Sequence, residues 1–303
     1  MASQLQLDST FGLLFVAFTI ATCLYGVTIL QCYTYFRTYN DAALLKSTVI
    51  LVLILDTAGT ACSAAGLYSY LITNYDNPPA LLGINIVLCV ESMITVIVTF
   101  IVQCFFAYSV WTVTSKNRLV TGFILFTAFS ALVIGLAMST EDIIQKTYSA
   151  LSENRFKIFA GLDLGIAALC DIAITVSLCY HFHYRKNGFK LTETLLDKLS
   201  VYSLNRGVLT FIVQLLNMVF FIASPDTDIW ALFHMSLSKV YMISFLATLN
   251  RRERLRKGSC GPIELGSDIR MQMLESDGDL HTRRTTIASH PSYDRGKASI
   301  TDV

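Results

Sequence analysis

Six charged side chains interrupt long apolar stretches of this sequence, and they are its main candidates for chemistry or for ligand binding. They are Asp56, Glu91, Asp163, Asp171, Arg206 and Lys239. A charge inside a membrane costs about 3 kcal/mol, so such groups face the interior of a bundle and pair, or mark the path of a ligand or ion. We therefore expect these residues to form a polar core.

The depth of each charge, at about 1.5 Å per helical residue, indicates which of them meet. Asp56 and Lys239 both fall near the middle of their stretches, whereas Glu91 lies somewhat nearer one end. Arg206 and Asp171 lie at a common depth, nearer the end of the bundle opposite to Glu91. The sequence thus predicts one pair of Lys239 with Asp56 or Glu91, and a second pair of Arg206 with Asp171. The alternative is that these pairs only fix the packing and bind no ligand.

The sequence carries no recognised catalytic or cofactor motif. His181 and His183 are two residues apart, so on a helix they point to different sides and cannot share one metal ion. His234 stands alone in its stretch, which is typical of a packing residue. A lysine in the seventh stretch is also found in retinal-binding proteins, but the aspartate that precedes it there by four residues is Met235 here. We therefore expect no enzyme activity, no metal and no cofactor.

The elements that must position these charges are seven apolar stretches, each long enough to cross the ~30 Å hydrocarbon core of a bilayer as a helix. Hydrophobic residues make up 53% of the chain and charged residues 15%. The stretches cover residues 11–36, 47–72, 83–111, 119–138, 158–184, 199–223 and 230–250. Because the connectors are short, the predicted fold is an all-α membrane protein, a seven-transmembrane-helix up-down bundle.

Lysine and arginine indicate the orientation of this bundle. The connectors after the first, third and fifth stretches, and the residues after the seventh, carry Arg37, Lys46, Lys116, Arg118, Arg185, Lys186, Lys190, Lys198, Arg251, Arg252, Arg254, Arg256 and Lys257. The other side carries Lys146, Arg155 and Lys157. Positive loops stay in the cytoplasm, so the N-terminus is expected outside and the C-terminus inside.

Three regions follow from this reading: a short extracellular N-terminus (1–10), the transmembrane domain (11–250) and a disordered cytoplasmic tail (251–303). We expect an integral multi-pass protein, in the plasma membrane rather than an internal one. A net charge of +1 gives no reason to expect a nucleic-acid partner.

Two further features concern packing. Gly161 and Gly165 are four residues apart, a spacing that predicts the close approach of a neighbouring helix, with Asp163 on the opposite face. The first and fourth stretches hold no charge, so they are expected to face mainly lipid.

Several segments carry a resemblance to a known family. They are Gly26 to Thr57, VQCFFAYSVW at the end of the third stretch, YSLNRGVLTFIVQ in the sixth, and SKVYMISFLATLNRRERLR at the end of the seventh. Over residues 11–256 the chain resembles an uncharacterised seven-transmembrane-helix family of mushroom-forming (basidiomycete) fungi, a domain of unknown function. The resemblance implies a seven-helix fold and a fungal origin without a chemistry. Tyr108-Ser109-Val110-Trp111 stands where rhodopsin-type G-protein-coupled receptors have Asp/Glu-Arg-Tyr, which argues against that class.

Three functions remain open. The first is a receptor-like or sensory protein that takes an unidentified small molecule among the second, third and seventh stretches, near Asp56, Glu91 and Lys239. Its cytoplasmic signalling partner would then contact the loop 185–198 and the tail 251–303, while the bilayer surrounds the bundle. The second is a proton-coupled transporter or channel that uses the same carboxylates as relay groups. The third is a scaffold whose charges are purely structural.

Overall fold

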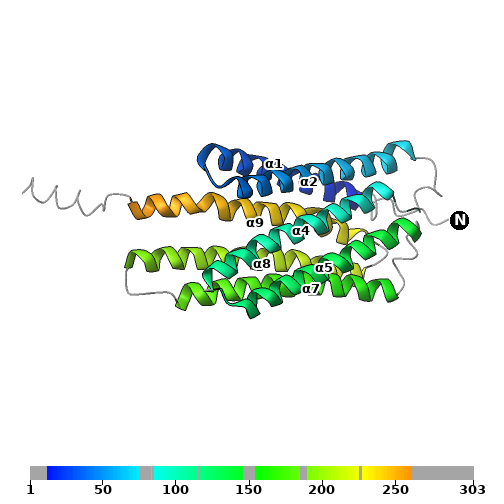
Figure 1. The fold of residues 1–303 in the computed structure, drawn as a ribbon. Coiled ribbons are helices and arrows are strands. Elements are labelled where there is room, and N and C mark those ends of the chain that lie inside the picture. Colours follow the sequence, from blue (N-terminus) through cyan, green and yellow to red (C-terminus); the bar gives the residue numbers. More distant parts are fainter. Residues whose placement is uncertain are drawn as a thin grey trace, which may run out of the picture. The chain divides into compact units, whose positions relative to one another are not determined.

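Seven long apolar helices run alternately up and down in the computed structural model (Figure 1). They are α1 (Leu13–Thr38), α2 (Ala43–Tyr68), α4 (Ile86–Val113), α5 (Arg118–Gln145), α7 (Asn154–Tyr184), α8 (Lys190–Ala223) and α9 (Ile229–Cys260). A π-helical turn, η2 (Ser69–Thr73), extends α2. The structure describes residues 12–74, 83, 85–114, 116–145, 154–184, 190–224 and 227–260. Within these residues, seven helices are long and apolar enough to cross a membrane.

Each predicted stretch coincides with one helix, but four helices are longer than predicted. α7 begins at Asn154 rather than at 158. α5 continues beyond 138 to Gln145, α8 begins at Lys190 rather than at 199, and α9 continues beyond 250 to Cys260. The apolar signal ends where the membrane would end, whereas backbone hydrogen bonding continues through Leu, Glu, Lys and Arg, which favour helices. Most of the predicted loop 185–198 and the start of the predicted disordered tail are therefore helical.

The chain divides into two compact units, Met1–Leu255 and Arg256–Val303. The bundle belongs to the first unit, and the predicted extracellular segment 1–10 and the tail beyond 260 lie outside the described residues. One end of the bundle, at which α1, α4, α7 and α9 begin, is named the amino end. The opposite end, where α2, α5 and α8 begin, is named the carboxyl end.

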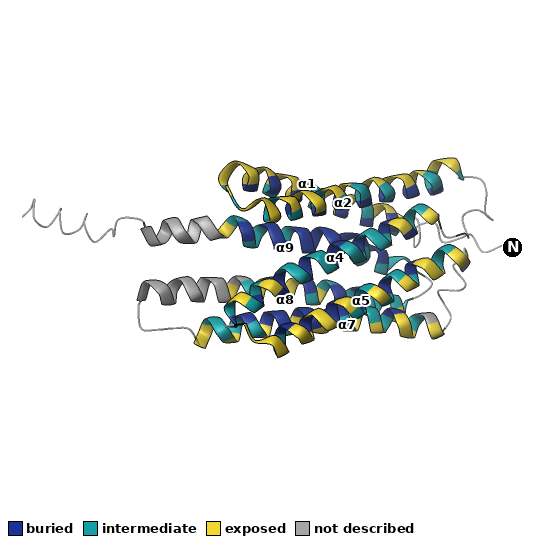
Figure 2. Ribbon diagram, in the orientation of Figure 1, coloured by how far each residue is buried: buried dark blue, intermediate teal, exposed yellow. Residues whose placement is uncertain are grey.

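The most buried helix is α9, as Figure 2 shows. In its most apolar window 67% of the residues are buried, against 22% to 39% in the other six spans. Yet α9 is also the least apolar of the seven spans, and Ser236, Ser238, Lys239, Tyr241 and Ser244 are all buried on it. A helix with polar residues in its middle is stable in a bilayer only if other helices cover and pair those residues.

Side chains from five helices meet those of α9. Asn250 donates from Nδ2 to the carbonyl oxygen of Gln31 on α1 at 2.9 Å, and the ring of Phe245 packs edge-on against Phe105 of α4. Lys239 meets α2, and Tyr241 meets both α7 and α8. A cluster of buried apolar side chains surrounds these contacts towards the carboxyl end, including Val102, Phe106, Ile174, Leu246 and Leu249. α9 therefore joins the bundle through its polar as well as its apolar side chains.

The predicted close approach at Gly161 and Gly165 is wrong. A Cβ atom placed on Gly165 would meet nothing within 4 Å, and one on Gly161 would meet only a methyl of Ile222 at 3.7 Å. The close approach is instead at Gly207 of α8, where a Cβ atom would collide with the side chain of Thr175 on α7. α7 does approach a neighbouring helix closely, but the glycine that allows this approach lies on α8 and not on α7.

The predicted lipid-facing position holds for α1 and is wrong for α5. α1 is the least buried span, whereas α5 is buried as much as α2 and α7. α5 packs between α4 and α7, and its last turn carries Asp142, which lies beyond the predicted end of the stretch. The absence of charge in 119–138 therefore did not indicate exposure to lipid.

The buried ion pair between Lys239 of α9 and Asp56 of α2, whose closest atoms lie 2.8 Å apart, makes a first prediction. Lys239→Met leaves Asp56 as an unpaired buried charge, and Asp56→Asn leaves Lys239 in the same situation. Each single variant should lose about 3 kcal/mol of stability, whereas the neutral double variant should recover most of it. Thermal unfolding of the purified chain in detergent measures this, and a double variant no more stable than the weaker single variant would contradict the pairing.

Candidate functional site

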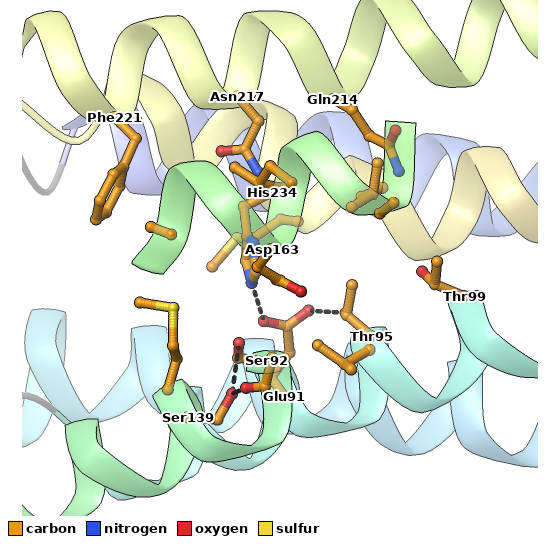
Figure 3. A pocket seen from close by; sticks show the side chains of 18 of the residues that line it. Glu91, Ser92, Thr95, Thr99, Ser139, Asp163, Gln214, Asn217, Phe221 and His234 are labelled. Atoms are coloured by element: carbon orange, nitrogen blue, oxygen red, sulfur yellow. Dashed lines mark hydrogen bonds and ion pairs between the residues drawn. The ribbon is translucent and has the colours of Figure 1, made fainter. Parts of the chain in front are cut away.

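A cavity of about 180 Å³ lies in the half of the bundle towards the amino end. Side chains of α4, α5, α7, α8 and α9 form nearly all of its wall, and Leu14 of α1 closes one side. All the helices reach it with the turns that lie nearest the amino end. Figure 3 shows the polar side chains that point into it. An apolar cavity of about 150 Å³ in another protein holds one benzene molecule, so this space fits a one-ring ligand.

Four carboxylates line the cavity: Glu91, Asp142, Asp163 and Asp228. Glu91 is buried, and the other three side chains are partly buried. Asp163 reaches across to α5, where one of its oxygens would lie 3.3 Å from a Cβ atom on Gly135. None of the described residues that line the cavity is a lysine or an arginine. Among the described residues, the cavity wall therefore carries more acidic than basic side chains.

Within the described part of the chain, His234 of α9 is the one basic side chain in the lining. Its Nε2 lies 3.8 Å from Oε2 of Glu91, while the hydroxyl of Thr95 donates to Oε1 of Glu91 at 3.1 Å. Nearby, the hydroxyl of Ser139 on α5 donates to that of Ser92 on α4 at 3.2 Å. These contacts join α4 to α5 and α9 at the cavity wall (Figure 3). They engage Glu91 and leave Asp163 without a hydrogen bond among the described residues.

Aromatic rings form part of the wall nearest the amino end. The ring of Trp230 packs edge-on against Phe221 of α8 and against His234, with centroids 5.5 Å and 5.8 Å apart. Phe100 of α4 lies deeper in the lining. Such faces bind the apolar part of a ligand, and they also attract a cation placed over them.

The floor of the cavity is amide-rich and bonds directly to a buried ion pair. Gln103 of α4 and Gln214 of α8 both line the cavity. Gln214 donates from Nε2 to the hydroxyl of Tyr241 at 2.5 Å, and Tyr241 donates to Oδ2 of Asp171 at 2.6 Å. Gln103 reaches Oδ1 of Asp171 at 3.5 Å, as does Nη2 of Arg206. The cavity is thus linked to the Asp171–Arg206 pair by an unbroken chain of side chains.

The pair of Asp171 and Arg206 was predicted, and the structure confirms it. Both side chains are almost fully buried, and their closest atoms lie 3.5 Å apart. The guanidinium carbon of Arg206 also lies 3.2 Å from the centre of the Phe106 ring. Asp171 accepts from three side chains in all, so both of its carboxylate oxygens have hydrogen-bond partners.

The pair of Lys239 and Asp56 is confirmed as well, but it lies apart from the cavity. Nζ of Lys239 donates to Oδ1 of Asp56 at 2.8 Å, and the hydroxyl of Ser238 donates to the same oxygen at 3.1 Å. Neither charged residue lines the cavity. Of the three residues expected to converge on a ligand, Glu91 lines the cavity, whereas Asp56 and Lys239 pair with each other outside it. α2 and α9 pack around their own ion pair there, and the space opens on the other side of α4.

Several residues of the site could not be identified from the sequence. His234 was assigned to packing, Asp142 lay outside the predicted stretch, and Gln103, Gln214 and Asn217 were not considered. Apolar stretches in a membrane contain few amides, so a Gln or Asn in the middle of a span was the available signal. Among the described residues, no three His, Cys, Asp or Glu side chains stand where they could hold a metal ion.

Comparison with known proteins finds a match to one family model, and the function of that family is unknown. Residues 167–254 match a family described as a family of unknown function, DUF6534. The matched part contains Asp171, Arg206, Lys239 and Tyr241, and thus most of the buried ion-pair network. No curated protein and no solved structure matches the chain. The protein is therefore a multi-pass membrane protein of unknown function, and its activity has to be argued from the site.

Asp228, just before α9, is a titratable side chain in the lining of the cavity. Burial raises the pKa of its carboxyl group to about 6. The folded state thus holds the proton more tightly than the unfolded state, in which an aspartate has a pKa of about 4. The ionised form is the costly one, so this group lowers stability fully above about pH 6, and the cost shrinks as the pH falls from there towards about 4, the unfolded pKa.

The second prediction concerns this residue. Asp228→Asn should raise the melting temperature at pH 8, and its advantage over the wild type should shrink towards pH 5. Glu141→Gln is the matched control, because Glu141 is exposed near the end of α5 and is absent from the cavity lining. Melting curves from pH 5 to 8 measure the difference. A pH-independent effect of Asp228→Asn would show that the ionised carboxylate carries no burial cost.

Proposed function

We propose that this protein is a receptor-like or sensory membrane protein that binds a small ligand in the cavity near the amino end. The observation that carries the proposal is the hydrogen-bonded route from the cavity floor to the buried Asp171–Arg206 pair. A ligand that contacts Gln103 or Gln214 would disturb the partners of Tyr241 and Asp171. Since Arg206 lies on α8 towards its carboxyl-end side, the disturbance reaches the turns nearest the opposite membrane face.

The orientation in this proposal follows the basic residues. Arg37 at the end of α1, Arg118 at the start of α5 and Arg251 near the end of the seventh span all belong to the carboxyl end. Positive residues favour the cytoplasmic side, so the carboxyl end faces the cytoplasm and the cavity faces outwards. The helical extension of α8 from Lys190 then replaces the predicted loop as the surface for a signalling partner. The plasma membrane is the proposed location, because an outward cavity there meets external ligands.

Proton-coupled transport is the second candidate, and the carboxylates of the cavity favour it. Glu91 and Asp163 line the cavity, and Asp171 lies beyond its floor, so they form a series of acidic groups along the bundle. A relay would also need a path to the carboxyl end. The apolar cluster around Phe106, Leu246 and Leu249 fills that region. For this reason we favour a sensor over a transporter.

The third prediction tests ligand binding in the cavity. Ala131 of α5 lines the cavity, and Ala131→Phe should fill part of it. A thermal-shift screen of the purified chain should find small molecules that raise the melting temperature of the wild type, because only binders of the native state do so. These shifts should disappear in Ala131→Phe. Val133→Phe is the matched control on the same helix, because Val133 is 50% exposed on the outer surface of the bundle.

The same compounds then separate the two candidate functions. For a sensor, proteoliposomes that contain the protein should take up none of them above empty liposomes, with or without a pH gradient. Uptake that depends on the gradient would favour the transporter. Compounds that stabilise the wild type and Ala131→Phe equally would contradict the cavity as the binding site.

A further inference from the structure

The charges around the cavity are unequal in number, and the nearby cations are already engaged. Four carboxylates face one histidine in the lining. Lys239 is bound to Asp56, and Arg206 is bound to Asp171 and stacked on Phe106, so neither reaches the cavity wall. Carboxylates in a poorly hydrated space are stabilised by an opposite charge. The cavity therefore favours a ligand that brings its own positive charge.

Two buried polar groups that have no partner give independent support for a ligand. Asn217 of α8 is 2% exposed, lines the cavity, and makes no side-chain hydrogen bond among the described residues. Thr99 of α4 also lines the cavity, and its buried hydroxyl has no partner there. Figure 3 shows both side chains on the wall that surrounds Asp163 and Glu91. Buried polar groups are normally hydrogen-bonded, so these two are available for the polar atoms of a ligand.

We propose that the cavity binds a small organic cation, a molecule with one ammonium group and an apolar body of about one ring. The ammonium group lies against Asp163, whose carboxylate has no hydrogen-bond or ion-pair partner among the described residues, and near Glu91 on the facing helix. The apolar body lies against Trp230, Phe221 and neighbouring aliphatic side chains, where an aromatic face also attracts the cation. This inference rests on the proposed function, because it takes the cavity to be a ligand site.

An organic cation fits this wall better than a metal ion does. The described residues offer no set of three donors that could hold a metal. Most of the lining is aliphatic or aromatic, with Leu88, Leu132, Met138 and Met235 among its members. A bare ion would leave these groups without contacts, whereas a ligand with a hydrocarbon body would bury its own surface against them.

The fourth prediction uses three cationic probes, each with a neutral partner of similar shape. The pairs are phenethylamine with 2-phenylethanol, cyclohexylamine with cyclohexanol, and choline with 3,3-dimethyl-1-butanol. Titrated into the purified full chain at pH 7.5, at least one cation should raise the melting temperature more than its neutral partner. Asp163→Asn should lower the affinity for that cation by roughly tenfold or more, since a charge-assisted contact is lost. Glu141→Gln, which changes an acid outside the cavity, should leave the affinity unchanged.

Each other result overturns the inference in a distinct way. If neutral partners bind as well as the cations, the cavity is an apolar or protonated site, and the proposed function stands without the cation. If the cations keep their advantage in both Asp163→Asn and Glu91→Gln, they bind elsewhere. If no compound of either kind, here or in the wider screen, distinguishes the wild type from Ala131→Phe, then both the inference and the proposed function fail.

Discussion

The bundle depends on one constraint: a polar group inside the bilayer must find its partner within the protein, because no water is available there. α9 concentrates this demand. It is the least apolar of the spans and the most buried, and its polar side chains reach α1, α2, α7 and α8. Lys239 and Tyr241 are two residues apart, so they leave α9 in different directions and bind different neighbours. α9 thereby fixes the register of two sets of helices at once.

This arrangement has a consequence for the cavity. The two buried cations lie where α9 and α8 need them for packing, and each is matched by one aspartate, Asp56 or Asp171. The described residues include no further buried lysine or arginine for the carboxylates of the cavity. Glu91 accepts a hydrogen bond from Thr95 and lies close to His234, whereas Asp163 has no such partner among the described residues. The acidic character of the cavity follows from how the bundle satisfies its other charges.

The sequence predicted the helices and the pair of Arg206 with Asp171, and it narrowed the partner of Lys239 to Asp56 or Glu91, because these follow from local rules. Apolar length indicates a span, and the depth along a span indicates which charges share a level, so Arg206 could be assigned to Asp171 before the fold was known. The sequence did not predict the position of the cavity. Whether Glu91 meets Lys239 or His234 depends on the rotation of α4 and α9, and depth alone carries no information about rotation. Helix ends such as Asp142 were missed because hydropathy reports the membrane boundary and not the end of hydrogen bonding.

The central claim is that the carboxylates of this bundle fall into a paired group, Asp56 and Asp171, and an unpaired group in the cavity, with Asp163 as its clearest member. A membrane-permeant carbodiimide, which modifies accessible carboxyl groups that are not held in ion pairs, tests this division directly. After a limited reaction of the folded chain, mass spectrometry should find Asp163 modified, and Asp56 and Asp171 unmodified. Modification of Asp56 or Asp171 as fast as that of Asp163 would contradict the division, and with it the origin that we assign to the acidic cavity.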